Sequence, residues 1–323
     1  MNNRRKWLGA AALAAAMRPA FAQSPNFPSK PISLVGPFPA GASTDVISRI
    51  YAAKLSPLLG TAVIVDNKPG AGGMISVNAV ARAPADGHTL LVVSNTFLIA
   101  PYVYRNPQYD ALTGFLPVTG LFTTPIALSA RPDFPAKSLA EFVALAKASP
   151  GKFSYSTWGI GTSAHLQMEL LRMRAGIDVL HVPYKNGPEA GQAVMGGQTD
   201  VGFDTVFSLA PRLKAGQLRA LTVFSPKRAT VLPEVPTNGE QGFADIEQLG
   251  FCGLVAALNT PREVIDKLVQ ASAQVVRDAD YGRRLRTYGA DPFLVTPEQW
   301  GNFMREETAK IREVTARLKI ALD

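Results

Sequence analysis

The chain has 323 residues, of which 47% are hydrophobic, and this length and composition favour a globular protein of about two domains. The formal net charge is +8, but the first 22 residues contain four Lys or Arg and no acid, which leaves +4 for the remainder. No Lys/Arg run with interleaved aromatic residues occurs, so nucleic-acid binding is not expected. The single cysteine, Cys252, excludes an internal disulfide, and three scattered histidines do not form a metal-binding cluster.

The N-terminal residues have the features of a secretory signal peptide. A basic segment at residues 3–6 precedes an apolar stretch at residues 7–17, and Ala20-Phe21-Ala22 has the A-x-A form of a cleavage site. We therefore predict a signal peptide over residues 1–22. The apolar stretch is shorter than the ~20 residues of a membrane-spanning helix. The pair Arg4-Arg5 leaves open whether export uses the general or the twin-arginine route.

The first third of the mature chain predicts alternating strands and helices. Apolar runs indicate strands at residues 32–38, 63–65 and 89–93, and helical spacing of apolar residues indicates helices at residues 47–58 and 74–82. The order β-α-β-α-β is typical of a parallel sheet with helices on both faces. Residues 102–124 have no regular pattern, and we predict irregular structure there.

The middle of the chain predicts a second region of the same kind. Ser138 and Glu141 form a capping box at the start of a helix. The predicted strands are residues 125–128, 153–157, 179–182, 200–203 and 218–224, and the predicted helices are residues 138–148, 166–173, 189–195 and 206–215.

The last part of the chain predicts a return to the first region. Residues 246–255 form a long apolar run that could cross back, and helices are predicted at residues 261–278 and 297–318. Two crossing segments imply two lobes separated by a cleft. We expect lobe 1 to contain residues 26–124 and 250–323, and lobe 2 to contain residues 125–249. Ligands of such α/β folds bind outside the carboxyl ends of the strands.

Two strand-to-helix loops, one in each predicted lobe, are candidate anion sites. In residues 37–45, Gly41 lets the backbone approach a ligand, and the first N–H groups of the following helix have no partner within the helix. Ser43 or Thr44 can serve as N-cap, and the helix dipole favours Asp45 in the first turn. An ordinary capped connection is the alternative interpretation. Residues 158–165 form the second such loop.

The second loop also matches the dinucleotide-binding pattern G-x-G-x-x-G/A at Gly159, Gly161 and Ala164. That fold requires an acid at the end of the next strand, whereas Asp178 precedes the strand at residues 179–182. We therefore expect no nicotinamide cofactor, and the sequence predicts no other cofactor.

The sequence does not predict an enzyme. Neither Ser43 nor Ser163 lies in the G-x-S-x-G motif of serine hydrolases. His88 begins a strand and His181 lies inside an apolar one. His165 lies in the first turn of a helix, which lowers imidazole basicity, so it is better placed to donate to a bound carboxylate than to act as a base.

Further side chains near these loops complete the predicted site. Ser94 and Asn95 follow a buried strand and would line its floor. Asp204 could accept a hydrogen bond from a ligand or cap the next helix. Trp158 and Phe207 could form an apolar wall.

The sequence as a whole resembles the Bug family, the extracytoplasmic receptors of tripartite tricarboxylate transporters. The resemblance rests on residues 37–45, 66–73, 159–162, 181–185 and 213–221, in order over essentially the whole mature chain. It implies an α/β, two-lobed periplasmic-binding-protein fold in which each lobe is a mainly parallel sheet flanked by helices. It implies a periplasmic receptor that closes over a small organic carboxylate and delivers it to membrane permease subunits, and we expect the protein to be a monomer. Carried onto this chain, the ligand-binding residues would be Phe38, Pro39, Ala40, Gly41, Ala42, Ser43, Thr44, Asp45, Ser94, Asn95, Trp158, Gly159, Gly161, Thr162, Ser163, His165, Asp204 and Phe207.

Two departures from the family pattern leave the ligand open. Ala42 stands where the family usually has a second glycine, and Phe251-Cys252 stands where it usually has Trp-Phe. Members bind aliphatic di- and tricarboxylates, amino acids and aromatic acids, and Trp158 and Phe207 favour an aromatic or elongated acid. A sensor that reports the same kind of ligand to a membrane kinase is the alternative function.

Overall fold

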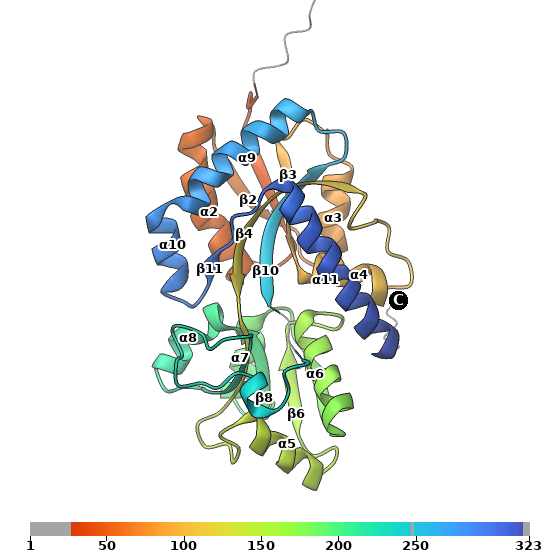
Figure 1. The fold of residues 1–323 in the computed structure, drawn as a ribbon, viewed down its shortest axis with the longest axis vertical. Helices are drawn as coiled ribbons and strands as arrows, with labels where there is room; N and C mark the ends of the chain where they lie inside the picture. The colour runs from red at the N-terminus through yellow and green to blue at the C-terminus, as the bar shows by residue number, and fades with distance from the viewer. Residues whose placement is uncertain (1–26, 247–248, 319–323) are drawn as a thin grey trace, which may run out of the picture.

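The computed structural model describes residues 27–246 and 249–318, and it consists of two α/β lobes stacked along the long axis of the molecule (Figure 1). We call the part built on the six-stranded sheet lobe 1 and the part built on the five-stranded sheet lobe 2. The predicted signal peptide at residues 1–22 lies outside the described residues. The predicted two-lobed α/β fold is confirmed.

The sheet of lobe 1 has the strand order β11-β4-β10-β3-β1-β2. β1 pairs in parallel with β2 and β3, and β10 lies antiparallel between β3 and β4. The inner strands β1, β3 and β10 are nearly continuous apolar runs because helices cover both faces. The strands are β1 (Ile32–Gly36), β2 (Val63–Asn67), β3 (Thr89–Ser94), β4 (Phe115–Thr124), β10 (Gly250–Ala257) and β11 (Asp291–Pro292).

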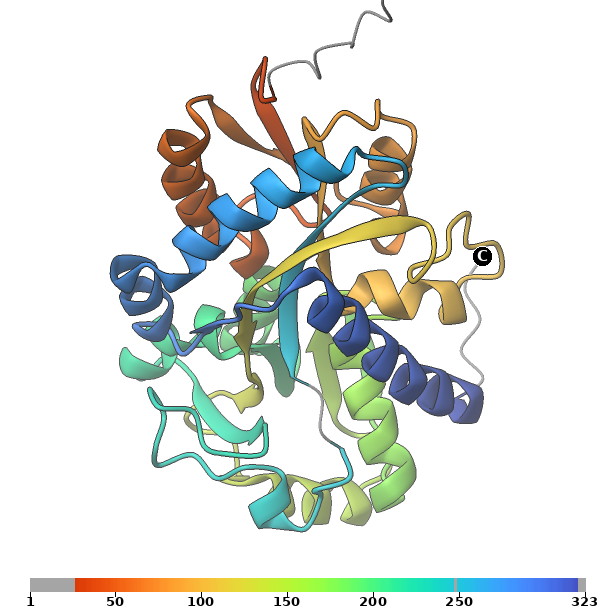
Figure 2. The ribbon, with the colours of Figure 1, turned by 45° about the horizontal axis from the view of Figure 1, so that its top comes forward.

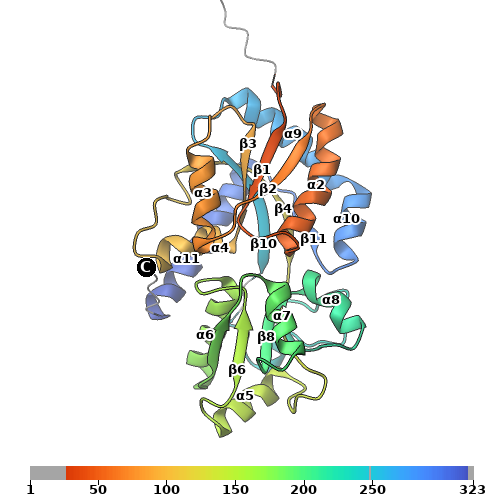
Figure 3. The same cartoon turned by 180° about the vertical axis from the view of Figure 1, so that it is seen from behind.

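Helices cover the two faces of this sheet and form a hydrophobic core on each side. α2 and α9 lie on one side of the sheet, and α3, α4 and α11 lie on the other (Figure 3). The first pair contributes to one core, with Tyr51 and Leu268 fully buried, and the other three contribute to the second core. Trp300 in α11 donates from Nε1 to the Leu254 carbonyl, 3.2 Å away, and so ties this helix to β10. The helices are α2 (Ser43–Leu59), α3 (Met74–Ala81), α4 (Asn95–Val103), α9 (Arg262–Arg277), α10 (Ala279–Arg286) and α11 (Pro297–Leu318), with a 3₁₀ turn η1 (Ala71–Gly73).

The sheet of lobe 2 has the strand order β7-β6-β8-β5-β9. Its helix α5 begins at the predicted capping box, where the Ser138 hydroxyl accepts from the Glu141 N–H at 3.2 Å. The strands are β5 (Ile126–Ala130), β6 (Ser154–Thr157), β7 (Leu180–Pro183), β8 (Val201–Thr205) and β9 (Arg219–Phe224); the helices are α5 (Leu139–Ala148), α6 (Ser163–Ala175), α7 (Gly187–Met195) and α8 (Val206–Lys214), with a 3₁₀ turn η2 (Gly239–Gln241).

Most strands of each sheet run in one direction, as expected, namely β1–β4 in lobe 1 and β6–β9 in lobe 2, but both sheets also contain strands of the opposite direction. β10 runs antiparallel to both of its neighbours in lobe 1, and β5 runs antiparallel to β8 and β9 in lobe 2. Parallel neighbours need a crossover connection within one sheet. The chain instead enters β5 and β10 from the other lobe, so each of these strands can run antiparallel to its neighbours without such a connection.

The prediction of irregular structure at residues 102–124 is confirmed for residues 104–114 and was wrong for the two ends of this segment. α4 continues to Val103, and β4 occupies the last ten of these residues. Pro117 and Gly120 interrupt the strand pattern in the sequence, but the ladder with β10 absorbs them through two register shifts. A side chain at position 120 would meet the Phe293 carbonyl at 2.5 Å, so glycine is required there by close packing.

The lobes contact each other around the two crossing segments. One segment joins β4 to β5, and the other leads into β10 and contains residues 247–248, outside the described residues. α11 of lobe 1 packs against α6 of lobe 2 (Figure 2). The residue boundaries given above for the lobes stay a prediction. None of the helices in residues 27–246 and 249–318 has the length and apolar character of a membrane span.

Candidate functional site

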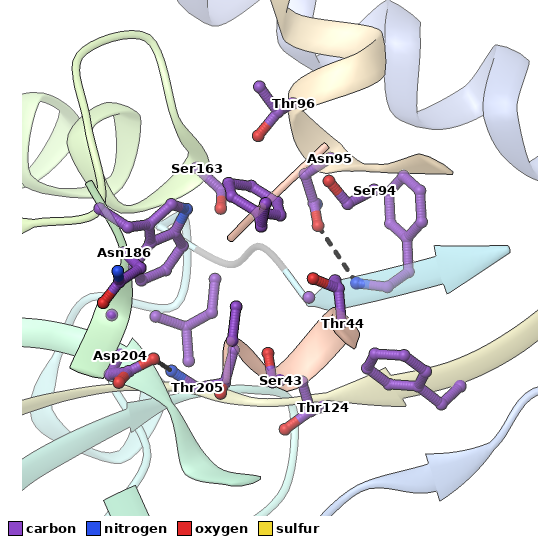
Figure 4. A pocket seen from close by; sticks show the side chains of 18 of the residues that line it. Ser43, Thr44, Ser94, Asn95, Thr96, Thr124, Ser163, Asn186, Asp204 and Thr205 are labelled. Carbon is purple, nitrogen blue, oxygen red and sulfur yellow. Dashed lines mark hydrogen bonds between the residues drawn. The ribbon is translucent and has the colours of Figure 1, made fainter. Parts of the chain in front are cut away.

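A chamber lies between the lobes where the loops after several strands meet, and we call it the inner chamber (Figure 4). Its cavity volume is about 60 Å³. Because its lining comes from both lobes, a bound molecule would contact both. It is lined by Phe38, Ala42, Ser43, Thr44, Ser94, Asn95, Thr96, Phe122, Thr124, Ile126, Trp158, Ser163, Asn186, Gly187, Pro188, Asp204, Thr205, Gly250 and Phe251.

Three helices begin at this chamber without a side-chain cap. The N-cap residues of α2, α4 and α6 are Ala42, Ser94 and Thr162, and none of these side chains accepts a hydrogen bond from its helix. Ser43 and Thr44 therefore lie inside the first turn of α2, and the prediction that one of them is the N-cap was wrong. The N-terminal ends of three helices, where the dipole is positive and the first N–H groups have no partner within the helix, thus lie at one small space.

Two more helices begin at the chamber and are capped by their own side chains. The Asn186 side chain accepts from the Glu189 N–H at 2.8 Å, and Thr205 Oγ1 accepts from the Ser208 N–H at 3.2 Å. Sequence reasoning missed both Asn186 and Thr205 as lining residues. The pattern Asn186-Gly-Pro-Glu189 is a recognisable helix start and could have indicated the first of them.

The same kind of hydrogen bond holds each of the two predicted anion loops. Gly41 donates its N–H to Asp45 Oδ2 at 2.9 Å, and Gly161 donates its N–H to His165 Nδ1 at 3.2 Å. In each case a side chain in the first turn of the helix binds a glycine four residues earlier. Asp45 and His165 therefore hold the loops, and neither lines the inner chamber.

Asp45 is further tied into lobe 1. Its Oδ1 accepts from Asn67 Nδ2 at 2.7 Å and from Arg49 at 2.8 Å, and the residue is only 5% exposed. Burial by itself would raise the pKa of Asp45, but Arg49, the Gly41 N–H and Asn67 outweigh burial and lower that pKa. Asp45 is thus a charged anchor of the loop.

The His165 ring lies behind the second loop in a stack of aromatic rings. It stacks on His181 with ring centres 4.3 Å apart, and His181 stacks on Tyr155 at 4.7 Å. Burial lowers the pKa of both histidines, that of His181 to about 3, so both rings are neutral at neutral pH. Since His165 Nδ1 accepts from Gly161, this geometry favours a positioning role over the predicted donation to a ligand.

Two buried polar atoms in the chamber wall, one from each lobe, have no hydrogen-bond partner among the described residues. These are Ser94 Oγ at the end of β3 and Asp204 Oδ2 at the end of β8. The other oxygen of Asp204 accepts from the Thr205 N–H at 2.7 Å (Figure 4). Burial raises the pKa of Asp204 to about 6. Buried polar groups in proteins are nearly always paired, so these two atoms indicate a ligand.

A second, outer chamber of about 610 Å³ adjoins the inner one. Phe38, Thr96 and Trp158 line both chambers, so Trp158 lies between them. Phe207 lies elsewhere, because its ring packs into the core of lobe 1 and contacts Tyr288 at 5.0 Å between ring centres. The predicted apolar wall thus contains Trp158 without Phe207.

The structure brings together half of the residues predicted from the sequence. Phe38, Ala42, Ser43, Thr44, Ser94, Asn95, Trp158, Ser163 and Asp204 line the inner chamber. Pro39, Gly159 and Thr162 line only the outer chamber. The remaining predicted residues line neither chamber: Ala40, Gly41, Asp45, Gly161, His165 and Phe207.

The chamber offers many neutral donors and few charges. Among its described lining residues there is no Lys, Arg or His, and Asp204 is the one acid. No cluster of His, Cys, Asp and Glu that could hold a metal ion occurs in residues 27–246 and 249–318. The arrangement can therefore bind a small anion through N–H groups, hydroxyls and helix dipoles without a salt bridge.

Comparisons with known proteins agree with this geometry. The sequence profile described as "Tripartite tricarboxylate transporter family receptor" matches residues 47–320. A protein of Bordetella pertussis, named only as a member of the UPF0065 group, is 35% identical over 298 residues, which cover 92% of each chain.

Three solved structures are similar over the whole fold. Periplasmic binding protein BugD has a TM-score of 0.86 and 32% identity over 92% of this chain and 100% of its own. Rpa4515 of Rhodopseudomonas palustris, solved with adipate, has a TM-score of 0.88 and 29% identity over 92% and 100%. MatC from the same organism, with bound malate, has a TM-score of 0.83 and 30% identity over 90% and 100%.

Proposed function

Because the chain belongs to the tripartite tricarboxylate transporter receptor family, and thus to the Bug proteins it resembles in sequence, we propose that it is a periplasmic receptor for a small organic carboxylate. It captures the acid between its lobes and delivers it to the membrane permease subunits of a tripartite transporter. The family is one of solute-binding receptors, and in this proposal the protein binds its ligand without chemical change.

The observation that carries the proposal is the convergence of three uncapped helix N-termini, those of α2, α4 and α6, on the inner chamber. A carboxylate at one helix N-terminus gains about 0.3–1 kcal/mol at an exposed site and up to about 2 kcal/mol when partly buried. Three such termini can hold an anion without a cationic side chain. The unpartnered Ser94 hydroxyl can donate to the same carboxylate.

Contacts between the lobes support capture by closure. Leu166 and Phe207 belong to helices of lobe 2 but pack into hydrophobic clusters of lobe 1, so the lobes meet on apolar surfaces around the chamber. A ligand that contacts both lobes adds its own interactions to the closed arrangement only. Differential binding of this kind shifts a hinged protein toward closure.

The chemistry of the relatives supports the ligand class. Rpa4515 was solved with adipate and MatC with malate, and both are small aliphatic dicarboxylates. The outer chamber beyond Trp158 gives room for the part of an acid that extends past the inner chamber.

The first test is binding of carboxylic acids to the mature chain. A thermal-shift screen of aliphatic, hydroxy, amino and aromatic acids selects candidates, and calorimetry measures their affinity. An acid present at 100 times its Kd stabilises the folded protein by about 2.7 kcal/mol. If no acid shifts the unfolding temperature and mass spectrometry of the denatured protein finds no acid already bound, the proposed function is wrong.

A pair of serine variants separates binding from stability. Ser94→Ala removes a buried hydroxyl that has no partner among the described residues, so the stability of the free protein should not fall, while the affinity should drop about 5- to 10-fold. Ser129→Ala removes a buried hydroxyl that donates to the Gly202 carbonyl at 3.2 Å, away from the chamber. It should lower stability by about 1 kcal/mol and leave the affinity unchanged.

A further inference from the structure

The inner chamber contains a carboxylate side chain, which is unfavourable for binding an anion. Asp204 lines it and is 3% exposed, and no cationic side chain occurs among the described residues that share this lining. A negative ligand and an ionised Asp204 would repel each other inside the same small cavity. The ligand must therefore supply something that compensates for this carboxylate.

Among the residues that the structure describes, none is a hydrogen-bond partner of the second oxygen of Asp204. Oδ1 accepts from the Thr205 N–H at 2.7 Å, whereas Oδ2 is buried and has no partner among the described residues. The Ser208 side chain lies near enough to favour the ionised form of Asp204, but it does not complete a hydrogen bond to Oδ2. The backbone of Gly187 lies so close that a Cβ there would be 2.1 Å from Oδ1 and 2.5 Å from Oδ2. The following residue, Pro188, has no N–H to donate.

Other neighbouring side chains do not supply the missing donor. The Asn186 amide group donates to Glu189 Oε1 at 2.8 Å. Arg212 also lies near enough to favour the ionised form of Asp204, but its guanidinium donates to the Pro188 carbonyl at 3.1 Å, and no ion pair joins it to Asp204. An ionised carboxylate that is buried with an unpaired oxygen is costly unless a ligand group pairs with it.

We propose that Asp204 Oδ2 accepts a hydrogen bond from an ammonium or hydroxyl group of the ligand, so that the preferred ligands are amino- or hydroxy-substituted carboxylic acids. This inference rests on the proposed carboxylate-receptor function and narrows its ligand class. The carboxylate of such an acid faces the helix N-termini while its substituent faces Asp204 from the side of lobe 2 (Figure 4). The small inner chamber accommodates this substituted end, and the remainder of the acid extends toward the outer chamber.

The experiment compares matched acids that differ only in the substituent. Unsubstituted, 2-hydroxy and 2-amino acids with three-carbon, four-carbon, five-carbon and phenyl backbones are titrated calorimetrically into the wild-type mature chain at neutral pH. On any backbone that binds, the hydroxy or amino acid should bind roughly tenfold or more tightly than the unsubstituted acid, as a hydrogen bond to a charged group implies.

Two variants assign this preference to Asp204. Asp204→Asn keeps the size of the side chain but removes its charge, and the preference should fall to about threefold or less. Ser163→Ala, at another position in the lining, is the matched control: it should weaken the substituted and unsubstituted acids equally and keep the preference. The preference of the wild-type chain tests the inference even if Asp204→Asn does not fold.

The outcomes separate this inference from the function on which it rests. If no acid of any set binds, the carboxylate-receptor function itself fails. If acids bind but the unsubstituted member binds as tightly as the others, the role of Asp204 is refuted. A preference for the substituted acid that Asp204→Asn retains at its wild-type size would also refute it, because the charge of Asp204 would then not be its cause.

Discussion

Replacement of Asp45 by alanine should loosen the first ligand loop and weaken ligand binding, although Asp45 does not line the chamber. The carboxylate accepts from the Gly41 N–H at 2.9 Å, from Asn67 Nδ2 at 2.7 Å and from Arg49 at 2.8 Å. The residues that follow Gly41, Ala42 to Thr44, form the chamber wall. The alanine variant removes all three contacts at once and leaves the Gly41 N–H and the Asn67 side-chain amide without this acceptor.

The magnitude follows from the exposure of each partner. A hydrogen bond to a charged group contributes about 1.5–3 kcal/mol, and the lower figure applies here because water can reach the exposed Gly41 N–H in the variant. The Arg49 side chain is 53% exposed, so its ion pair adds at most about 1 kcal/mol. We therefore expect Asp45→Ala to lower the free energy of unfolding by about 3 kcal/mol.

The effect on affinity comes from the loop. If the binding-competent loop conformation falls to about one tenth of the population, the apparent Kd rises about tenfold. Urea denaturation and calorimetry with the tightest-binding acid measure the two quantities. Arg49→Ala, the matched control, should cost no more than about 1 kcal/mol and leave the Kd unchanged. An Asp45→Ala variant that loses about 3 kcal/mol but keeps the Kd within about twofold would refute the loop argument.

Three further changes test other parts of the site. Thr162→Ala removes the hydrogen bond from Oγ1 to the Gly159 carbonyl at 2.7 Å, so it should lower the free energy of unfolding by about 1 kcal/mol and weaken ligand binding. Thr162→Ser should restore both the stability and the affinity, which thermal unfolding and calorimetry measure. Asn95 connects α4 to the segment that leads into β10, because its side chain donates to the Leu249 carbonyl at 3.0 Å and accepts from the Phe251 N–H at 3.1 Å. Asn95→Ala should therefore lower the free energy of unfolding by about 2–4 kcal/mol, as measured by urea denaturation. A loss below about 0.5 kcal/mol would contradict this role. Because burial raises the pKa of Asp204 to about 6, the folded state holds its proton to a higher pH than the unfolded state, and the stability of the free protein should fall as the pH rises from about 4 to about 6. Asp204→Asn should remove this fall, and an unchanged pH profile of unfolding would show that another group causes it.

The sequence alone predicted the class of fold and the two loops. Apolar runs such as residues 32–36 and the capping box at Ser138 and Glu141 are local signals, because strand burial and helix capping depend on residues close together in the chain. The end of an apolar run before a helical pattern is also a local signal, and it predicted that Gly41 and Gly161 lie in loops before helices. Both glycines have positive φ angles, 87° and 70°.

The sequence could not show which side chains turn into the chamber. Asp45 and His165 have the residue types of ligand contacts, but each accepts a hydrogen bond within its own loop, from the N–H of the glycine four residues earlier. Phe207 was predicted at the ligand and packs into the other lobe. These choices depend on which neighbours the tertiary fold brings close, and the spacing of residues along the chain does not encode them.

The tertiary structure also decided which distant segments form one site. Ser94 and Asp204 are 110 positions apart, and only the meeting of the two lobes places their unpartnered oxygens in the wall of the same chamber. Thr124 and Gly250 line it because the chain crosses between the lobes there. The sequence by itself thus determined the fold class and the loops that can bind an anion, since those follow from local hydrogen bonding. The assembled chamber was decided by long-range packing between the lobes.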